Sequence, residues 1–335
     1  MIKFVENFIK ENKLIEPNST IVIALSGGVD SMVLFHLMRK LNYNVVVAHV
    51  NHKVRLESET EEKYIKELCQ NENIPLEIIH LEKIDKNFEA EAHNKRYSFF
   101  LEVCKKYNSK YLLTAHHADD NIETIFLNLM SGSNLYGYGG ISKKLVIRGI
   151  NVIRPLLLLS KKDIKAYALQ NNITYFEDYT NQSDDYARNR IRHHIIPMLK
   201  NECPNILEKA NSFSKQIHEA FDFARECSTN FLSTTIYDAK VYIGLIEIDK
   251  FKKLHPYIKK DVICLMLEQE NIERNEHLIN DIINVIESDK PQIDYDLKGN
   301  FIFRKLYNNA YITQKNKKNA YYYEINNFDD KIKCS

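Results

Sequence analysis

The sequence predicts an α/β domain, with a parallel sheet flanked by helices in a Rossmann-like arrangement, followed by a smaller and mainly helical domain. Up to about residue 180, short apolar runs alternate with helical patterns, and such alternation places helices on both faces of a parallel sheet. Beyond about residue 200, apolar residues recur at steps of three and four. The 335 residues also exceed the ~250 to 300 at which single cores stop growing, which favours two domains.

Four short runs in the first part have the character of buried strands. They are rich in β-branched or aromatic residues and apolar on both faces, as strands of a covered parallel sheet are. In such sheets ligands bind beyond the carboxyl ends of the strands, so the polar residues after positions 25, 50 and 115 should converge there. The predicted strands are 21–25, 45–50, 76–81 and 111–115, and the predicted helices are 29–41, 58–73, 91–107, 119–130 and 160–172.

The second part is predicted to consist of amphipathic helices closed by a small hairpin. Apolar residues mark helical faces over 206–224, 258–265 and 278–286. The apolar runs 301–303 and 311–313 flank Asn308-Asn309, which suits a hairpin turn. These patterns predict an α/β domain over 1–200, a mainly helical domain over 201–315 and a tail of uncertain order over 316–335.

Composition excludes several classes of protein. The 46 basic and 45 acidic residues leave a net charge of 46 − 45 = +1, which argues against a nucleic-acid binder that relies on bulk positive charge. No apolar window is long enough to span a membrane, and an acid lies in the first residues where a signal peptide needs an apolar run. We therefore expect a cytoplasmic protein with no membrane partner. The six cysteines never form C-x-x-C, the usual spacing of zinc, iron–sulfur and redox sites.

The most informative segment is Ser26-Gly27-Gly28-Val29-Asp30-Ser31, between the first strand and the first helix of the sheet. Adjacent glycines let the backbone turn tightly and present N–H groups at a helix N-terminus, where anions are favoured. The segment therefore suits phosphate or pyrophosphate, although a capped tight turn without a ligand would have the same glycines. No Lys-Ser or Lys-Thr follows the glycines, so it is not a Walker A loop, and the dinucleotide fingerprint is also absent.

This segment resembles the PP-loop of N-type ATP pyrophosphatases, whose fold is adenine nucleotide alpha hydrolase-like. Those enzymes cleave ATP between the α and β phosphates to activate a carbonyl oxygen as an adenylate. The resemblance implies that the residues from Ser26 to Ser31, including Gly27, Gly28 and Val29, bind the nucleotide. It also implies that Asp30 is catalytic and binds Mg²⁺, which neutralises charge on the phosphates.

Six later motifs, in the same order, resemble the successive signatures of the tRNA(Ile)-lysidine synthetase family. That family adenylates the C2 oxygen of the wobble cytidine, position 34, of a CAU-anticodon tRNA(Ile). The ε-amine of L-lysine then displaces AMP, and the resulting lysidine changes codon recognition from AUG to AUA. The resemblance implies ATP and Mg²⁺ as cofactors, L-lysine and that tRNA as partners, and it leaves a homodimer possible. It also implies that 1–200 is the PP-loop catalytic domain and that 201–315 is a tRNA-binding domain. The motifs are VNHKVR at 50–55, EAHNKRY at 91–97, HHADDNIET at 116–124, RPL at 154–156, ED with Asn181 at 177–181, and RNRIR at 188–192.

Asp120 and Glu123 are the candidate lysine-binding and catalytic acids. They are three residues apart near the start of a predicted helix, so their side chains share one face. A lysine substrate needs carboxylates to hold its ammonium and to accept a proton, and the resemblance places both acids in that role. Acids at a solvated helix N-terminus would give the same spacing without any ligand.

The remaining candidates surround these acids in the resemblance. His52, Arg55 and His116 would bind the nucleotide, although a solvent-exposed role for His52 stays open. His116 and His117 with their neighbouring acids could also form a metal cluster, but nucleotide or lysine contact is preferred. The basic residues assigned to tRNA, or to the ATP phosphates, are Arg96, Arg188, Arg190 and Arg192.

At His93 the sequence departs from the family pattern, and three other functions are compared with the same motifs. His93 replaces the arginine that the family usually has, which leaves one phosphate or tRNA contact in question. Amidating PP-loop enzymes share the S-G-G-x-D-S segment but lack the Asn51-His52 and RNRIR motifs. PP-loop tRNA thiolases usually need cysteines that this chain lacks in the required spacing. A non-catalytic adenine-nucleotide sensor would need the loop but not Asp120 and Glu123.

Overall fold

The computed structural model describes residues 1–51, 57–81, 88–177, 184–233 and 243–315. Contacts between residues divide the chain into two units, Met1–His218 and Glu219–Ser335. Each unit has a sheet and a hydrophobic core of its own. The proposed domain limits at residues 200 and 315 remain a prediction, and the tail from 316 to 335 lies outside the described residues. None of the helices in the described ranges has both the length and the apolar character needed to cross a bilayer.

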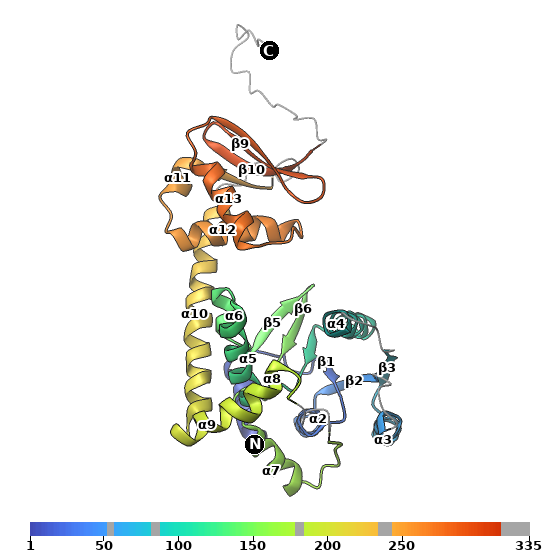
Figure 1. The fold of residues 1–335 in the computed structure, drawn as a ribbon. Coiled ribbons are helices and arrows are strands. Elements are labelled where there is room, and N and C mark those ends of the chain that lie inside the picture. Colours follow the sequence, from blue (N-terminus) through green and yellow to red (C-terminus); the bar gives the residue numbers. More distant parts are fainter. Residues whose placement is uncertain (52–56, 82–87, 178–183, 234–242, 316–335) are drawn as a thin grey trace. The chain divides into compact units, whose positions relative to one another are not determined.

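The first unit is built on a six-stranded sheet with the order β3-β2-β1-β4-β6-β5 (Figure 1). The pairs that join β3, β2, β1, β4 and β6 are parallel, and β5 pairs with β6 in the antiparallel sense. This confirms the predicted parallel sheet and its four strands. The strands are β1 (Thr20–Ala24), β2 (Asn44–Asn51), β3 (Leu76–His80), β4 (Tyr111–Leu113), β5 (Lys144–Ile147) and β6 (Ile150–Ile153).

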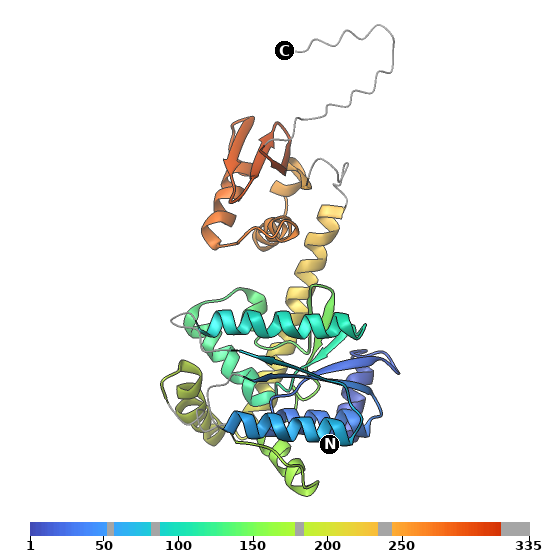
Figure 2. The ribbon, with the colours of Figure 1, turned by 90° about the vertical axis from the view of Figure 1, so that its right-hand side faces the viewer.

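Helices cover both faces of this sheet, as Figure 2 shows with α4 on one side and α2 and α3 on the other. Successive strand residues point to opposite faces. On β1, Ile21 and Ile23 therefore join the core beneath α2 and α3, while Val22 packs beneath α4. The helices that the periodicity predicts are present. The first unit's helices are α1 (Ile2–Glu11), α2 (Val29–Lys40), α3 (Glu57–Asn71), α4 (Phe88–Lys106), α5 (Ala118–Ser131), α6 (Leu135–Tyr138), α7 (Lys161–Gln170), α8 (Ala187–Arg190) and α9 (Ile196–Glu202), with a π-helical turn η2 (Ile191–Ile195).

Strand β1 marks the point at which the order of the sheet reverses. The chain runs outward from β1 to β2 and β3, and then returns to place β4 on the other side of β1. The segments that follow β1 and β4 consequently leave the sheet side by side, which in open α/β sheets is where ligands bind. The glycine loop follows β1, and the His116-His117 motif follows β4.

The second unit contains more sheet than its helical periodicity predicts. The predicted hairpin is present as β9 (Phe301–Leu306) and β10 (Asn309–Gln314), turning at Tyr307 and Asn308. Two further strands, β7 (Ile243–Glu247) and β8 (Gln292–Asp296), extend it to an antiparallel sheet of order β7-β10-β9-β8. This sheet packs with helices α11 (Ile248–Lys252), α12 (Pro256–Gln269) and α13 (Glu276–Glu287) around Phe251 and Phe303. Helix α10 (Ile206–Ser233) begins in the first unit and ends in the second.

Candidate active site

The glycine loop forms a compact turn from β1 into α2. Gly27 has φ +89°, a left-handed conformation that side-chain-bearing residues rarely adopt, and its carbonyl accepts a hydrogen bond from Phe176 N. Ser31 Oγ accepts from Ser26 N at 3.2 Å and donates to the Gly28 carbonyl at 2.9 Å. These bonds hold the two serines together, with their hydroxyls 3.1 Å apart. The loop therefore has the fixed geometry that a phosphate-binding turn requires.

The second part of the site is the N-terminus of α5. His117 caps the helix: its Nδ1 accepts from Asp120 N at 3.4 Å, and Asp120 Oδ2 accepts from His117 N at 3.0 Å. The same imidazole lies between two carboxylates, with Nε2 3.4 Å from Asp120 and 3.7 Å from Asp30 Oδ1. The ring thereby connects the loop after β1 with the helix after β4. Asp120 thus lies at the helix N-terminus, but its side chain is only 15% exposed, so the alternative of a solvated terminus does not describe it. It belongs to a polar cluster that we define as the four acids Asp30, Asp119, Asp120 and Glu123 with His117 and the cations that pair with them.

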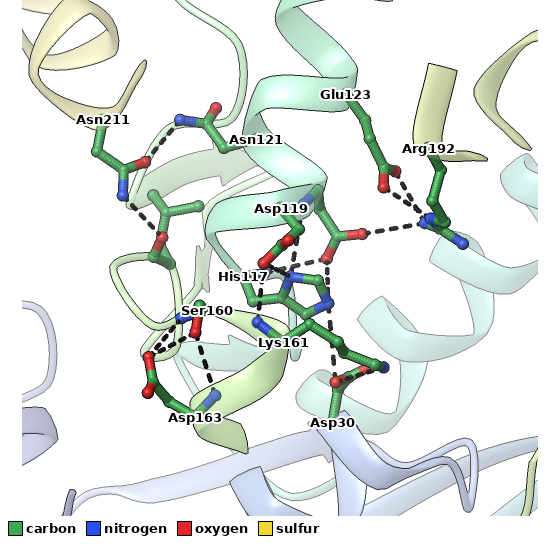
Figure 3. Close-up of polar contacts among 12 residues, drawn as sticks. Asp30, His117, Asp119, Asn121, Glu123, Ser160, Lys161, Asp163, Arg192 and Asn211 are labelled. Carbon is green, nitrogen blue, oxygen red and sulfur yellow. Dashed lines mark hydrogen bonds and ion pairs between the residues drawn. The ribbon is translucent and has the colours of Figure 1, made fainter. Parts of the chain in front are cut away.

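Two lysines from distant parts of the chain pair with acids of this cluster, as Figure 3 shows for Lys161. Lys161 Nζ donates to both carboxylate oxygens of Asp30, at 2.8 and 2.6 Å. Its backbone N–H donates to Asp119 Oδ2 at 2.8 Å, while Lys200 Nζ donates to Asp119 Oδ1 at 2.5 Å. Lys161 is the first residue of α7, so this helix begins directly beside the glycine loop.

Two arginines of the RNRIR motif pair with the candidate lysine-binding acids. Arg188 Nε donates to Glu123 Oε2 at 2.9 Å, and Arg192 donates to both Glu123 oxygens, at 2.7 and 2.8 Å. Their guanidinium groups also lie 3.4 and 3.6 Å from Asp120 Oδ1. Ile191, between them, is buried with the apolar face of α5, which fixes the two arginines above the acids.

The charges of the cluster are layered. The carboxylates lie inside: the exposed fraction of the side chain is 2% for Glu123, 12% for Asp119 and 15% for Asp120. The cations that pair with them, together with Lys161, are 34% to 40% exposed. An approaching ligand therefore meets ammonium and guanidinium groups first. This layering explains how a chain of net charge +1 presents a local surface suited to polyanions.

The pKa values of Asp120 and of the neighbouring His116 are displaced from their usual values. Burial opposes ionisation of Asp120, but the neighbouring His117, His116 and Arg188 outweigh it and hold the pKa of Asp120 below its usual value. Burial lowers the pKa of His116 to about 4, so this imidazole is neutral at neutral pH. His116 Nδ1 lies 2.9 Å from Thr114 Oγ1, which orients the ring at the end of β4.

The structure brings together most of the predicted site residues, but not all. Arg190 turns away from the acids and donates to the carbonyls of Asp184 and Asp185, at 2.8 and 2.9 Å. Arg96 lies partly buried on α4 and forms no ion pair with the cluster in the described part of the chain. His52 and Arg55 lie outside the described residues.

Sequence reasoning missed Lys161, Lys200 and the buried partners of Asn121. The Asn121 amide donates to Asn211 Oδ1 at 2.9 Å (Figure 3). It also donates to Ser214 Oγ at 2.9 Å and accepts from Ile141 N at 2.7 Å. It thereby fixes α5 against the first part of α10. The sequence offered one signal for Asn121, which is a polar residue between the candidate acids Asp120 and Glu123. No feature of the neighbouring sequence marks Lys161 or Lys200.

The residues present fit Mg²⁺ as an ion shared with a nucleotide. Mg²⁺ takes oxygen ligands and is often held by one or two carboxylates together with substrate phosphates. Asp30 supplies such a carboxylate at the glycine loop. Across the described ranges, no group of three or more His, Cys, Asp or Glu could hold a metal by itself. The alternative of a protein-only metal cluster at His116 and His117 therefore finds no support.

Comparison with known proteins places this site in a family. Residues 2–199 match the PP-loop domain family. The chain is 38% identical over 237 residues to the tRNA(Ile)-lysidine synthase of Enterococcus faecalis, an alignment covering 69% of this chain and 51% of that protein. It is 32% identical over 302 residues to the tRNA(Ile)-lysidine synthase of Streptococcus mutans, covering 89% of this chain and 67% of the other. The bifunctional protein TilS/HprT of Listeria innocua is 32% identical over 319 residues, covering 91% and 49%.

The chain spans about half to two thirds of the length of these curated relatives. Among solved structures, the U34-tRNA thiolase NcsA of Methanococcus maripaludis superposes with a TM-score of 0.54 at 16% identity, covering 64% of this chain and 78% of that one. That likeness concerns the fold alone. With the sequence relatives and the match to residues 2–199, the chain belongs to the PP-loop family and, within it, to the tRNA(Ile)-lysidine synthases.

Proposed function

We propose that the protein ligates L-lysine to C2 of the wobble cytidine, position 34, of CAU-anticodon tRNA(Ile), at the expense of ATP. The main support for this proposal is that the glycine loop lies close to the acid pair of α5, Asp120 and Glu123. Asp30 and Asp120 lie on either side of one imidazole, that of His117. A nucleotide on the loop and an amine on the acids would therefore be neighbours. The names of the relatives support the same substrates.

The reaction would proceed in two displacements. The C2 oxygen of the cytidine attacks the α-phosphorus of ATP, and the bond to the β-phosphate breaks, which releases pyrophosphate. The lysine ε-amine then attacks C2, AMP leaves with the oxygen, and the amine loses a proton. The N–H groups and hydroxyls from Ser26 to Ser31 would hold the departing pyrophosphate. Mg²⁺, held by Asp30 and the phosphates, would neutralise the charge that develops there.

The acids of α5 would bind the lysine. Glu123 and Asp120 are acceptor groups with little exposure to water, which favours an ammonium ligand that brings its own charge. Arg188 and Arg192 neutralise both acids. Lysine would replace part of these contacts, and the released guanidinium groups would be available to phosphate oxygens of tRNA or ATP. The low pKa of Asp120 suits it to remain a charged counter-ion.

Three of the cysteines, Cys69, Cys104 and Cys264, do not favour the chemistry of a PP-loop thiolase. Cys69 and Cys104 are buried, and burial raises their pKa values to about 11 and about 12. Because the thiolate is the reactive form, these two thiols are poor nucleophiles and poor metal ligands at neutral pH. Cys264 is shifted in the same direction by burial.

The proposal is tested by incubating the protein with ATP, Mg²⁺, radiolabelled lysine and unmodified CAU-anticodon tRNA(Ile). We expect label to enter this tRNA and not elongator methionine tRNA. Asp30→Ala should abolish labelling while circular dichroism and thermal unfolding remain those of a folded protein, because Asp30 is a partly exposed residue in the first turn of α2. Normal turnover by Asp30→Ala would contradict the PP-loop assignment.

A further inference from the structure

We propose that Lys161 is a phosphate-contacting residue of the ATP site, held by Asp30 until the nucleotide binds. The inference rests on the proposed function, since it takes the glycine loop to be an ATP site. Lys161 is 131 residues from Asp30 in sequence, yet its Nζ donates to both oxygens of that carboxylate, at 2.8 and 2.6 Å. Its ammonium thus lies beside the first turn of α2, where the phosphates would sit.

The backbone of Lys161 is fixed, while its side chain can move. Ser160 caps α7 in a capping box with Asp163, and Lys161 N donates to Asp119 Oδ2 at 2.8 Å. These contacts anchor the start of α7 at the site (Figure 3). The four-carbon stem beyond this anchor has several rotatable bonds, so the ammonium can move from Asp30 to a neighbouring oxyanion without movement of the helix.

The pair that holds Lys161 is weak enough to exchange. Its side chain is 37% exposed and that of Asp30 is 27% exposed, and solvent weakens ion pairs that are this open to it. Such a pair adds little to the stability of the fold. The ion pair does, however, hold a cation at the loop and neutralise Asp30.

The loop itself lacks the cation that a triphosphate needs. In the Walker A loop a lysine next to the glycines reaches the β and γ phosphates, but the segment from Ser26 to Ser31 contains no basic residue. Lys161, which is distant in sequence, places a cation beside this loop in the folded structure. Were Asp30 to hold Mg²⁺, at most one of its oxygens would remain for the ammonium. Lys161 would then be free to contact a polyanion at the loop, and we assign its contact to the β or γ phosphate.

Direct binding measurements test this assignment without relying on turnover. The ligands are α,β-methylene-ATP, which cannot be cleaved between the α and β phosphates, and adenosine, which has no phosphates. Calorimetry with Lys161→Met should show about tenfold weaker binding of α,β-methylene-ATP and a smaller dependence on salt, with adenosine binding unchanged. Lys161→Arg, which keeps the cation, should restore most of the affinity. Lys162→Met removes the same charge from the next, exposed residue of α7 and should bind both ligands normally.

Two results would overturn the assignment. Wild-type affinity of Lys161→Met for α,β-methylene-ATP would show that no phosphate contact is lost, and equal losses for adenosine and the analogue would show that the residue is structural. These failures are distinct from failure of the proposed function. If wild-type protein binds the analogue but transfers no lysine to tRNA, the ligase assignment fails while the role of Lys161 stands on the binding data.

Discussion

Replacing Glu123 with glutamine separates lysine binding from nucleotide binding. Glu123 is nearly inaccessible to water, and its two oxygens accept three hydrogen bonds from Arg188 and Arg192, at 2.7 to 2.9 Å. Glutamine keeps the shape but removes the charge, and one of its two ends becomes an N–H₂ group that faces a guanidinium donor. At least one charge-assisted hydrogen bond is therefore lost.

The size of the effect follows from these contacts. A hydrogen bond to a charged group contributes roughly 1.5 to 3 kcal/mol. The guanidinium groups are 39% and 34% exposed, so water replaces part of the lost interaction, and we expect a loss of about 2 kcal/mol in the free energy of unfolding. A similar loss of interaction with the lysine ammonium would raise the KM for lysine by roughly 10- to 100-fold. ATP affinity should change less than about twofold, because in the proposed function the glycine loop, and not Glu123, holds the nucleotide.

The assay is lysine-dependent labelling of tRNA over a range of lysine concentrations, together with calorimetric binding of α,β-methylene-ATP. The matched control is Asp261→Asn, which neutralises another buried carboxylate that pairs with an arginine, Arg225, at 3.0 Å in the second unit. It should lower stability without changing the KM for lysine. If Glu123→Gln weakens lysine use and ATP binding equally, or leaves both unchanged, the assignment of Glu123 to lysine is wrong.

Three further outcomes are expected. Lys305 is buried, and its Nζ donates to two carbonyls at the end of α13, at 3.0 and 2.5 Å. Lys305→Met should therefore lower the free energy of unfolding by about 2 kcal/mol. A urea unfolding midpoint equal to that of the wild type would refute this role. Burial opposes ionisation of Glu62, but hydrogen bonds from Lys66, Asn51 and His80 lower its pKa to about 2. The ionised carboxylate therefore stabilises the fold fully above pH 4.5, and this contribution is lost as the pH falls towards 2. Wild-type protein should accordingly lose more stability than Glu62→Gln between pH 5 and pH 2, whereas parallel curves would contradict the shift. Arg192→Ala should weaken tRNA binding and reduce the slope of its salt dependence by about one, while an unchanged slope would exclude a phosphate contact.

The first unit could be predicted closely from sequence because its signals are local. Its predicted strands are continuous apolar runs, and each matches β1, β2, β3 or β4 to within two residues at either end. The edge hairpin of β5 and β6 was missed, although Arg148-Gly149 between two apolar runs is a turn signal, and both residues have positive φ, 48° and 82°. In the second unit, β8 alternates exposed and partly buried residues, so it lacks the apolar run that marks a strand.

The site could be predicted only as far as its residues belong to motifs. The spacing of Asp120 and Glu123 predicts that they share one face of a helix, and both pair with the same arginines in the structure. The sequence assigned Arg188 and Arg192 to phosphates and did not predict that they pair with these acids. Which of the alternating arginines faces the acids depends on the turn η2 and on the burial of Ile191, and spacing alone does not give this. The ion pair of Lys161 with Asp30 depends on where α7 returns to the sheet, which is a property of the tertiary fold.

The central claim is that cleavage of ATP between its α and β phosphates drives transfer of lysine to one tRNA. It is tested most directly by supplying ATP labelled in the α-phosphate together with labelled lysine and unmodified CAU-anticodon tRNA(Ile), and by counting both products. We predict one AMP released for each lysine incorporated, at C2 of cytidine 34, and no incorporation into methionine tRNA. Formation of ADP, or of AMP without lysine in the tRNA, would contradict the claim.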